Sequence, residues 1–318
     1  MGAAMGMSMK VGSLCTGIAG LDLGLQMAGV ETEPVFVSDI DEGANDWLAA
    51  NMPDVPNLGD FTALDELPEV DIITAGFPCQ PVSMAGQRQG INDERWIFDD
   101  IARLTSRMGT RPLLFLENVP GLLTANAGDA MGRVVHGLAD IGYHITYGTL
   151  PASAVGAPHR RNRWWGLAYS ADADVARLEK QRVAFGSEPE LDRLGGDQSF
   201  APDATSAERR GPQQQAVAAT VRSAAESGEH HRSDADRFGK WAPAIARWGT
   251  ILERPAPDPT DDGRLNPAFV EWMMGYPEGW VTDTLTNRRQ SLHALGNAVV
   301  PRCAAQAFTQ LAKRLDST

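Results

Sequence analysis

The stretch KVGSLCTGIAGLDLGLQMAGVETEPVFVSDID, residues 10–41, has the pattern of a strand, a glycine-marked turn, a helix and a second strand. Residues 10–15 are mostly apolar and predict a short buried strand. Residues 16–30 predict a turn that runs into a helix with one apolar face, and residues 33–41 predict a strand that ends in acids. A helix between two strands is typical of an α/β sheet.

The same alternation continues along the first half of the chain. The further elements expected are helices at 42–55 and 96–108, a strand at 70–78, a strand and loop at 111–123, and two strands joined by a proline-containing turn within 143–170. The nearly continuous apolar run at 70–78 suits a parallel strand covered on both faces. The sequence therefore predicts an α/β fold with a doubly wound, mostly parallel, Rossmann-like sheet.

The composition changes after residue 170, where the chain becomes polar and rich in glycine and proline. We expect three parts: 1–170, an irregular region at 171–263, and a segment at 264–318 whose helices return to the first core. Order is expected to return near 238–252, where Trp241 and Trp248 indicate a small local core.

The totals exclude several classes of protein. The 318 residues are 43% hydrophobic and 22% charged, which is ordinary for a globular chain, and they contain no long apolar run that predicts a membrane span. Three cysteines, odd in number and far apart, argue against a disulfide framework and favour a reducing cytoplasm. No zinc-type spacing of Cys or His occurs, so no metal is expected. A net charge of −13 weakly disfavours a nucleic-acid partner, yet arginines cluster at 160–163 and 288–289, which a local basic cleft requires.

The glycine turn favours a nucleoside ligand. Gly17, Gly20 and Gly24 do not form the G-x-G-x-x-G pattern that binds a pyrophosphate. Asp39 follows about 20 residues later at the end of the second strand, where a carboxylate accepts both ribose hydroxyls. A plain β–α turn with a solvated aspartate remains the alternative.

Asp60 and Phe61 are weaker candidates. The stretch LGDFTAL places Asp60 after another expected strand, where it is suited to accept from an adenine amino group while Phe61 packs on the ring. Most loop aspartates instead cap a helix or form a turn.

Cys79 follows the strand at 70–78 on a proline-containing turn. Ligands of open α/β sheets bind at the carboxyl ends of the strands, and a partly exposed thiol there is a candidate nucleophile. A lone cysteine is more often a small buried apolar residue. The flanking residues Pro78, Gln80 and Pro81 argue against a position for Cys79 in the interior of a buried strand.

Two further groups of polar residues lie at or near the ends of expected strands. Glu117 and Asn118 end the strand at 111–123, where a partly desolvated acid suits proton donation; a cap or surface acid is the alternative. Arg161 and Arg163 alternate along a strand and so share a face, which suits a phosphate or a carbonyl oxygen; the alternative is a solvated basic edge.

The order and spacing of these motifs resemble the C5-cytosine-specific DNA methyltransferase family over about residues 10–170 and 264–313. The motifs that carry the resemblance are SLCTGIAGLDLGL (13–25), SDID (38–41), GDFTAL (59–64), GFPCQPVS (76–83), ENVPGLL (117–123), HRRNRWW (159–165), LNPAFVEWMMGYP (265–277) and ALGNAVVPRCAAQA (294–307).

The resemblance implies an S-adenosylmethionine-dependent transfer of a methyl group to C5 of a flipped-out cytosine in duplex DNA. It implies that Cys79 is the nucleophile, that Glu117 acts at N3 of the ring, and that Arg161 and Arg163 hold the base or the thiolate. The implied cofactor contacts are Gly17, Ile18, Gly20, Asp39, Ile40, Asp60, Phe61, Pro78, Asn297 and Val299. The implied base-side and lid residues are Gln80, Ser83, Gly86 and Asn118.

The sequence departs from the family pattern at a few positions. Cys15 stands where Phe is usual, Ala19 where Gly is usual, His159 where Gln is usual and Ala298 where Ser is usual, and the second-motif acid is Asp39 rather than Glu. These departures bear on the packing of ligands more than on the reaction.

By the same resemblance, residues 1–170 form the catalytic domain, 171–263 the target-recognition region, and 264–318 a segment that returns to the catalytic domain. A cytoplasmic monomer with a place in a restriction-modification system is expected. Two alternatives stay open, namely a tRNA cytosine-5 methyltransferase and a catalytically silent DNA-binding relative.

Overall fold

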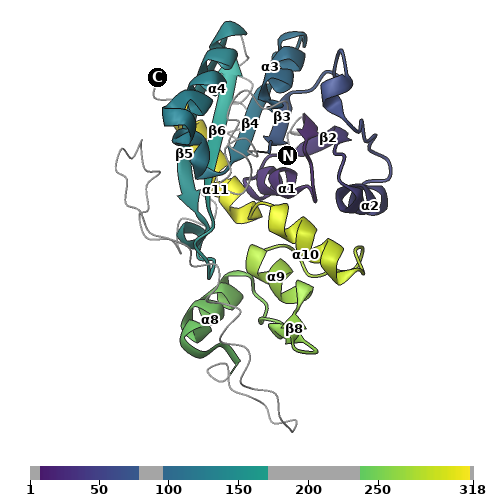
Figure 1. Cartoon of the computed structure of the whole chain (residues 1–318), viewed down its shortest axis with the longest axis vertical. Helices are drawn as coiled ribbons and strands as arrows, with labels where there is room; N and C mark the ends of the chain where they lie inside the picture. Colours follow the sequence, from purple (N-terminus) through teal and green to yellow (C-terminus); the bar gives the residue numbers. More distant parts are fainter. Residues whose placement is uncertain (1–7, 79–95, 171–236, 316–318) are drawn as a thin grey trace, which may run out of the picture.

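The computed structural model describes residues 8–78, 96–170 and 237–315 (Figure 1). Its centre is a six-stranded sheet in the order β2-β1-β3-β4-β6-β5. The strands are β1 (Met9–Leu14), β2 (Thr32–Ser38), β3 (Ile72–Gly76), β4 (Leu113–Asn118), β5 (Tyr143–Pro151) and β6 (Asn162–Ser170). The pairs formed by β1 to β4 are parallel, whereas β6 is antiparallel to both β4 and β5. The expected α/β sheet is confirmed.

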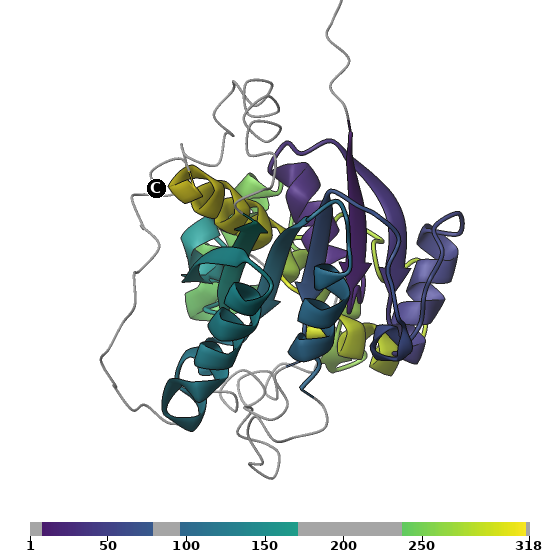
Figure 2. The ribbon, with the colours of Figure 1, turned by 90° about the horizontal axis from the view of Figure 1, so that it is seen from above.

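Helices cover both faces of this sheet (Figure 2). One core contains residues of α1 (Gly20–Met27) and α11 (Pro301–Leu315), and the other contains residues of α3 (Phe98–Ser106) and α4 (Asp129–Asp140). In β3, the neighbouring Ile72 and Ile73 enter opposite cores, because successive side chains of a strand point to opposite faces. The strand within the apolar run at 70–78 is therefore covered on both faces, as the composition of that run predicted.

The remaining elements lie beyond the carboxyl ends of the parallel strands, except α2, which lies beside β2 (Figure 1). They are α2 (Glu42–Asn51), α8 (Ala242–Ile251), α9 (Pro267–Met274), α10 (Arg288–Asn297) and a small hairpin of β7 (Thr260–Asp261) and β8 (Arg264–Leu265). Short 3-10 turns are η1 (Phe61–Ala63), η3 (Pro120–Leu123), η4 (Ala125–Gly128), η5 (Ala152–Val155) and η7 (Gly239–Trp241). The chain between α10 and α11 is extended at Ala298, whose ψ is 158°. Pro301 begins α11, and proline is suited to that position because a first-turn N–H makes no hydrogen bond within the helix.

Two local expectations were wrong. No strand precedes Asp60, because the backbone of Pro56–Leu58 makes a single bridge to β2 and then leaves it. The expected local core around residues 238–252 is also absent. Trp248 is fully buried in the core shared with α9 and α11, whereas Trp241 is 55% exposed. The ammonium group of Lys240 lies 5.3 Å from the centroid of the Trp241 ring.

Within the described ranges, no helix is long and apolar enough to cross a membrane. In the same ranges Cys15 and Cys303 are both free thiols. No group of three or more His, Cys, Asp or Glu side chains there is suited to hold a metal ion.

Candidate active site

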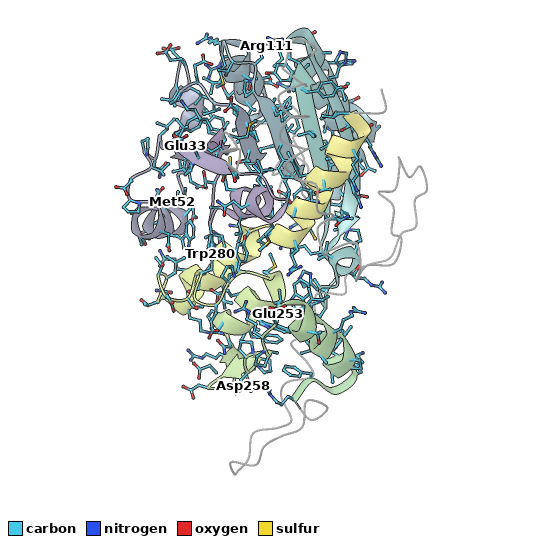
Figure 3. The ribbon with its side chains drawn as sticks, turned by 180° about the vertical axis from the view of Figure 1, so that it is seen from behind. Glu33, Met52, Arg111, Glu253, Asp258 and Trp280 are labelled. Carbon is cyan, nitrogen blue, oxygen red and sulfur yellow. The ribbon has the colours of Figure 1, made fainter. Side chains whose placement is uncertain are left out.

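The candidate residues gather at one edge of the sheet, formed by the carboxyl ends of β1, β2, β3 and β4 and by the start of β6. Gly17, Asp39 and Pro78 follow strands that end at this edge, and Glu117 is the penultimate residue of β4. Arg163 lies at the start of β6, which reaches the same edge because β6 runs antiparallel to β4. Figure 3 shows the opposite edge at Arg111, just before β4 begins.

Glu117 and Arg163 form a buried ion pair. Glu117 lies opposite Trp165 in the β4–β6 ladder, so Arg163, two residues earlier, faces the same side of the sheet. The Arg163 Nε lies 2.8 Å from Glu117 Oε1. Burial raises the pKa of Glu117, while the charges of Arg163 and Arg161 oppose that rise. The carboxyl group is thus held in place yet accepts a proton more readily than an exposed glutamate does.

Arg161 makes a different contact. Its Nη2 donates to the carbonyl oxygen of Ala298 at 2.6 Å, while its Nε is buried without a hydrogen-bond partner. Arg161 therefore joins the start of β6 to the chain between α10 and α11. Although both arginines act electrostatically on Glu117, a direct ion pair of Glu117 is formed with Arg163.

His159 supports this arrangement as a neutral side chain. Its Nε2 lies 3.1 Å from the Met273 carbonyl oxygen, and its Nδ1 lies 3.4 Å from the Arg161 backbone nitrogen. Because a carbonyl accepts and an N–H donates, these contacts select the tautomer with the proton on Nε2. Burial lowers the pKa of His159, which keeps Nδ1 free to accept.

Asn118 fixes the chain that leads to the cysteine motif. Its side-chain amide donates to the Phe77 carbonyl oxygen at 3.1 Å, and its Oδ1 accepts from the Val119 backbone at 2.8 Å. Pro78 is exposed directly after this anchor. The candidate nucleophile and the lid candidates lie outside the described residues: Cys79, Gln80, Ser83 and Gly86.

The glycine turn lies beside the end of β2. The Gly17 backbone donates to Asp39 Oδ2 at 2.7 Å, and the Asp41 backbone donates to Asp39 Oδ1 at 2.9 Å. Cys15, Gly17 and Ala19 have φ values of 51°, 55° and 55°, which places two non-glycine residues in the left-handed region. A Cβ at Gly17 would meet nothing within 4 Å, so the space next to its Cα is open.

Asp39 and Asp60 both lie within electrostatic range of Cys15. Burial, Asp39 and Asp60 together raise the pKa of the Cys15 thiol to about 12. The Asp60 carboxylate accepts from the backbone and hydroxyl of Thr62 and caps the short η1 turn, as the alternative interpretation had it. Phe61 is buried, whereas Ile40 is 74% exposed next to Asp39.

Asn297 is the last residue of α10, and Val299 lies in the chain between α10 and α11. Asn297 is exposed and its side chain contacts His293, while Val299 is buried. The Val299 carbonyl oxygen accepts from the Tyr276 hydroxyl at 3.0 Å. Gly20, the first residue of α1, packs directly against Val299 and Tyr276. The carboxyl-terminal segment thus closes one side of the glycine turn.

The sequence analysis missed two polar groups at this edge. Asp22 accepts from Ser13 Oγ at 2.9 Å and from Thr74 Oγ1 at 3.3 Å, and burial raises its pKa. The Trp280 indole donates to the Ile18 carbonyl oxygen at 2.9 Å. The sequence contains no local signal for either contact, since Asp22 occupies an ordinary first-turn helix position and Trp280 is 262 residues away from its partner.

Gly20→Ala is expected to destabilise the fold. An added Cβ would overlap the Tyr276 hydroxyl and lie 2.8 Å from Val299 Cγ2, and both groups are packed in the core. We expect a loss of about 1–3 kcal/mol in the free energy of unfolding, measured by urea denaturation. Gly132→Ala in α4 is the matched control: its Cβ would meet nothing within 4 Å, so it is expected to be neutral or stabilising. Equal stability of the two variants would contradict the close packing at Gly20.

The family model for C-5 cytosine-specific DNA methylases matches residues 9–313. The chain belongs to this family. Among curated methylases, it is 36% identical to the Type II methyltransferase M2.BsuMI of Bacillus subtilis over 58% of this chain and 47% of that protein. It is 37% identical to M.BanI of Aneurinibacillus aneurinilyticus over 49% of this chain and 37% of that protein. These matches thus span about half, or less, of the length of the curated relatives.

Solved structures of methyltransferases have the same fold. The Dnmt2 methyltransferase of S. pombe is similar with a TM-score of 0.56 and 18% identity, covering 97% of this chain and 99% of that one. The methyltransferase EhMeth of Entamoeba histolytica is similar with a TM-score of 0.57 and 14% identity, with the same coverage. At these identities the likeness is one of fold, and the methylase family membership depends on the sequence match.

Proposed function

We propose that this methylase is a DNA (cytosine-5)-methyltransferase that acts on a flipped-out cytosine in a specific duplex site. The observation that carries the proposal is the buried Glu117–Arg163 pair, which lies opposite Gly76 at the end of β3. Asn118 anchors the Phe77 carbonyl, two residues before Cys79. A proton-holding carboxyl group beside the chain that carries a thiol suits attack on a pyrimidine ring.

The proposed reaction takes place on the cytosine ring in a series of steps. The Cys79 thiolate adds to C6, and Glu117 gives a proton to N3, so that the electrons of the C5–C6 bond become available at C5. When bound, S-adenosylmethionine would supply the electrophilic methyl group that C5 takes up, and the break of its S–CH3 bond would leave S-adenosylhomocysteine as the product. Water then removes the proton from C5, the Cys79–C6 bond breaks, and N3 returns its proton to Glu117. Arg163 holds Glu117 in position throughout, and Arg161 supports the same region.

The residues at the glycine turn fit a nucleoside cofactor. Gly17 has open space beside its Cα, Asp39 presents a carboxylate for the ribose hydroxyls, and the exposed Ile40 offers an apolar contact for the adenine. Further contacts are assigned to Ile18, Gly20, Asp60, Phe61, Pro78, Asn297 and Val299. Because Asp39 already accepts from the Gly17 backbone, ribose binding needs its remaining lone pairs or a small rearrangement of that carboxylate.

Duplex DNA is the proposed partner despite the net charge of −13. The target base is paired inside a duplex, so it must leave the helix to reach Cys79. Residues 171–263 are assigned to recognition of the DNA site, with 1–170 and 264–318 as the catalytic part. Gln80, Ser83 and Gly86 are assigned to the loop that closes over the base. The type II methyltransferases among the relatives support a place in a modification system.

The test of this proposal is transfer of a labelled methyl group from S-adenosylmethionine. We expect label in duplex DNA and none in tRNA, and bisulfite sequencing of DNA from expressing cells should place the product at C5 of cytosine in one recurring site. Label in tRNA alone would replace the proposal with the RNA alternative. Binding of DNA without any label would favour the catalytically silent alternative.

A covalent adduct is expected with 5-fluorocytosine. Fluorine at C5 cannot leave as a proton does, so the Cys79–C6 bond should persist after methyl transfer. The adduct should appear as a slower band on a denaturing gel that requires both the target duplex and S-adenosylmethionine. Its absence, under conditions where the unmodified duplex is methylated, would contradict a covalent mechanism.

A further inference from the structure

A buried carboxylate organises the turn that follows α9. Glu271 is 1% exposed, and its two oxygens accept from the backbone N–H groups of Gly279, Val281 and Thr282 at 2.9, 2.7 and 3.0 Å. Charge-assisted bonds to successive N–H groups hold a turn in one conformation. Glu271 therefore determines where the residue between Gly279 and Val281 points.

That residue is Trp280, which lies between the sheet and the carboxyl-terminal elements in Figure 3. Its carbonyl oxygen accepts from the Trp47 indole of α2, and its ring packs on Trp47 with centroids 5.3 Å apart. The ring also stacks on Tyr276, with centroids 6.1 Å apart. Two aromatic neighbours hold the ring of Trp280, and Glu271 holds the backbone on both sides of it, so the indole N–H has a defined direction.

The indole N–H points at the glycine turn. It donates to the Ile18 carbonyl oxygen at 2.9 Å. Ile18 lies between Gly17 and Ala19, which both have left-handed φ values near 55°. A non-glycine residue in that region costs free energy and persists only where its surroundings hold it. The hydrogen bond from the Trp280 indole to the Ile18 carbonyl oxygen restrains the glycine turn in this way, although Trp280 is far from Ile18 in the sequence.

We propose that Trp280 is a positioning residue for the S-adenosylmethionine site, acting through Ile18 and itself oriented by Glu271. The inference rests on the proposed function, since it takes the glycine turn to be the place where the cofactor binds. The bond holds the Ile18 peptide so that the Gly17 backbone stays against Asp39 and the open space beside Gly17 keeps its shape. Trp280 acts on the affinity for the cofactor and not on the step at the cytosine.

Trp280→Phe tests this inference, because phenylalanine keeps an aromatic ring against Trp47 and Tyr276 but has no N–H for Ile18. We expect the Kd and KM for S-adenosylmethionine to rise by about five-fold, the value of one ordinary hydrogen bond. The kcat at saturating cofactor should stay within about two-fold of wild type, because the Glu117 site is unchanged. A thermal unfolding scan checks that the variant is folded.

Trp248→Phe is the matched control. The Trp248 indole, in α8, also donates to a backbone carbonyl, but its partner at 3.0 Å is Trp272 in α9 and not the glycine turn. Its loss should lower stability without changing the Kd for S-adenosylmethionine, measured by isothermal titration calorimetry. An unchanged Kd in Trp280→Phe, or an equal rise in Trp248→Phe, would overturn the inference while leaving the proposed function in place. No binding of S-adenosylmethionine by the wild type would overturn both.

Discussion

Cys79→Ser is expected to abolish methyl transfer to duplex DNA while DNA and S-adenosylmethionine still bind. A serine hydroxyl is a much weaker nucleophile than a thiolate at neutral pH, so C6 of the cytosine would not be attacked and C5 would stay unreactive. We expect kcat to fall by about 10³-fold or more, as for other enzymes that lose their nucleophile. Single-turnover transfer of a labelled methyl group measures the effect.

Cys303→Ala is the matched control for loss of a thiol. Cys303 is 2% exposed in the core and its thiol has no part in the proposed reaction. Burial raises its pKa far above the usual range, which keeps it protonated and unreactive. This variant should keep the wild-type rate when corrected for folded protein. Near-normal turnover by Cys79→Ser would refute the nucleophile assignment.

Glu117→Gln should lower kcat by about 10²–10⁴-fold, the usual contribution of a positioned general acid. Glutamine keeps an oxygen for Arg163, but its amide N–H groups are not acidic and cannot transfer a proton to N3 of the ring. The affinity for S-adenosylmethionine should change little, because the glycine turn lies between β1 and α1 and not at the end of β4. Because Arg163 Nε would then face a neutral amide in place of the carboxyl group, activity must be compared per folded molecule.

Glu69→Gln serves as the control for this substitution. Glu69 accepts from the Gly109 and Thr110 backbones near the start of β4, at the edge of the sheet away from the site. The Glu69→Gln substitution should leave kcat unchanged. If Glu117→Gln retained wild-type kcat, protonation of the base by this carboxyl group would be excluded.

The same carboxyl group should give the reaction a pH dependence. Burial raises the pKa of Glu117, so its protonated form, which the proposed mechanism uses at N3, persists to higher pH than in an exposed glutamate and is lost as pH rises through that raised value. The folded state binds this proton more tightly than the unfolded chain does. Ionising Glu117 therefore also destabilises the fold as pH rises from the ordinary glutamate pKa through the raised one. The alkaline limb of a kcat–pH profile should disappear in Glu117→Gln.

The sequence by itself determined which segments become strands and helices and which candidate residues stand at strand ends. Residues 70–78 predict a doubly covered strand, and Glu117 is placed at the end of β4, because periodicity and apolar runs are encoded within a few neighbouring residues. The position of Cys79 in the chain is equally a matter of sequence, although the residue itself lies outside the described ranges. Asp60 shows where such local prediction ends. The stretch before it predicts a strand, but in the structure Asp60 caps the 3-10 turn η1, because short stretches do not determine which neighbours they meet.

Only the tertiary structure decided the order of the strands and the contacts across the site. Inserting β6 antiparallel between β4 and β5 brings Arg163 to Glu117, and folding the carboxyl-terminal segment back brings Trp280 to Ile18. These partners are far apart in the chain, and each pairing exists because both faces of one sheet must be buried at once. Local patterns specify the elements, whereas the need to cover two apolar faces and to satisfy the polar groups between them selects which elements meet.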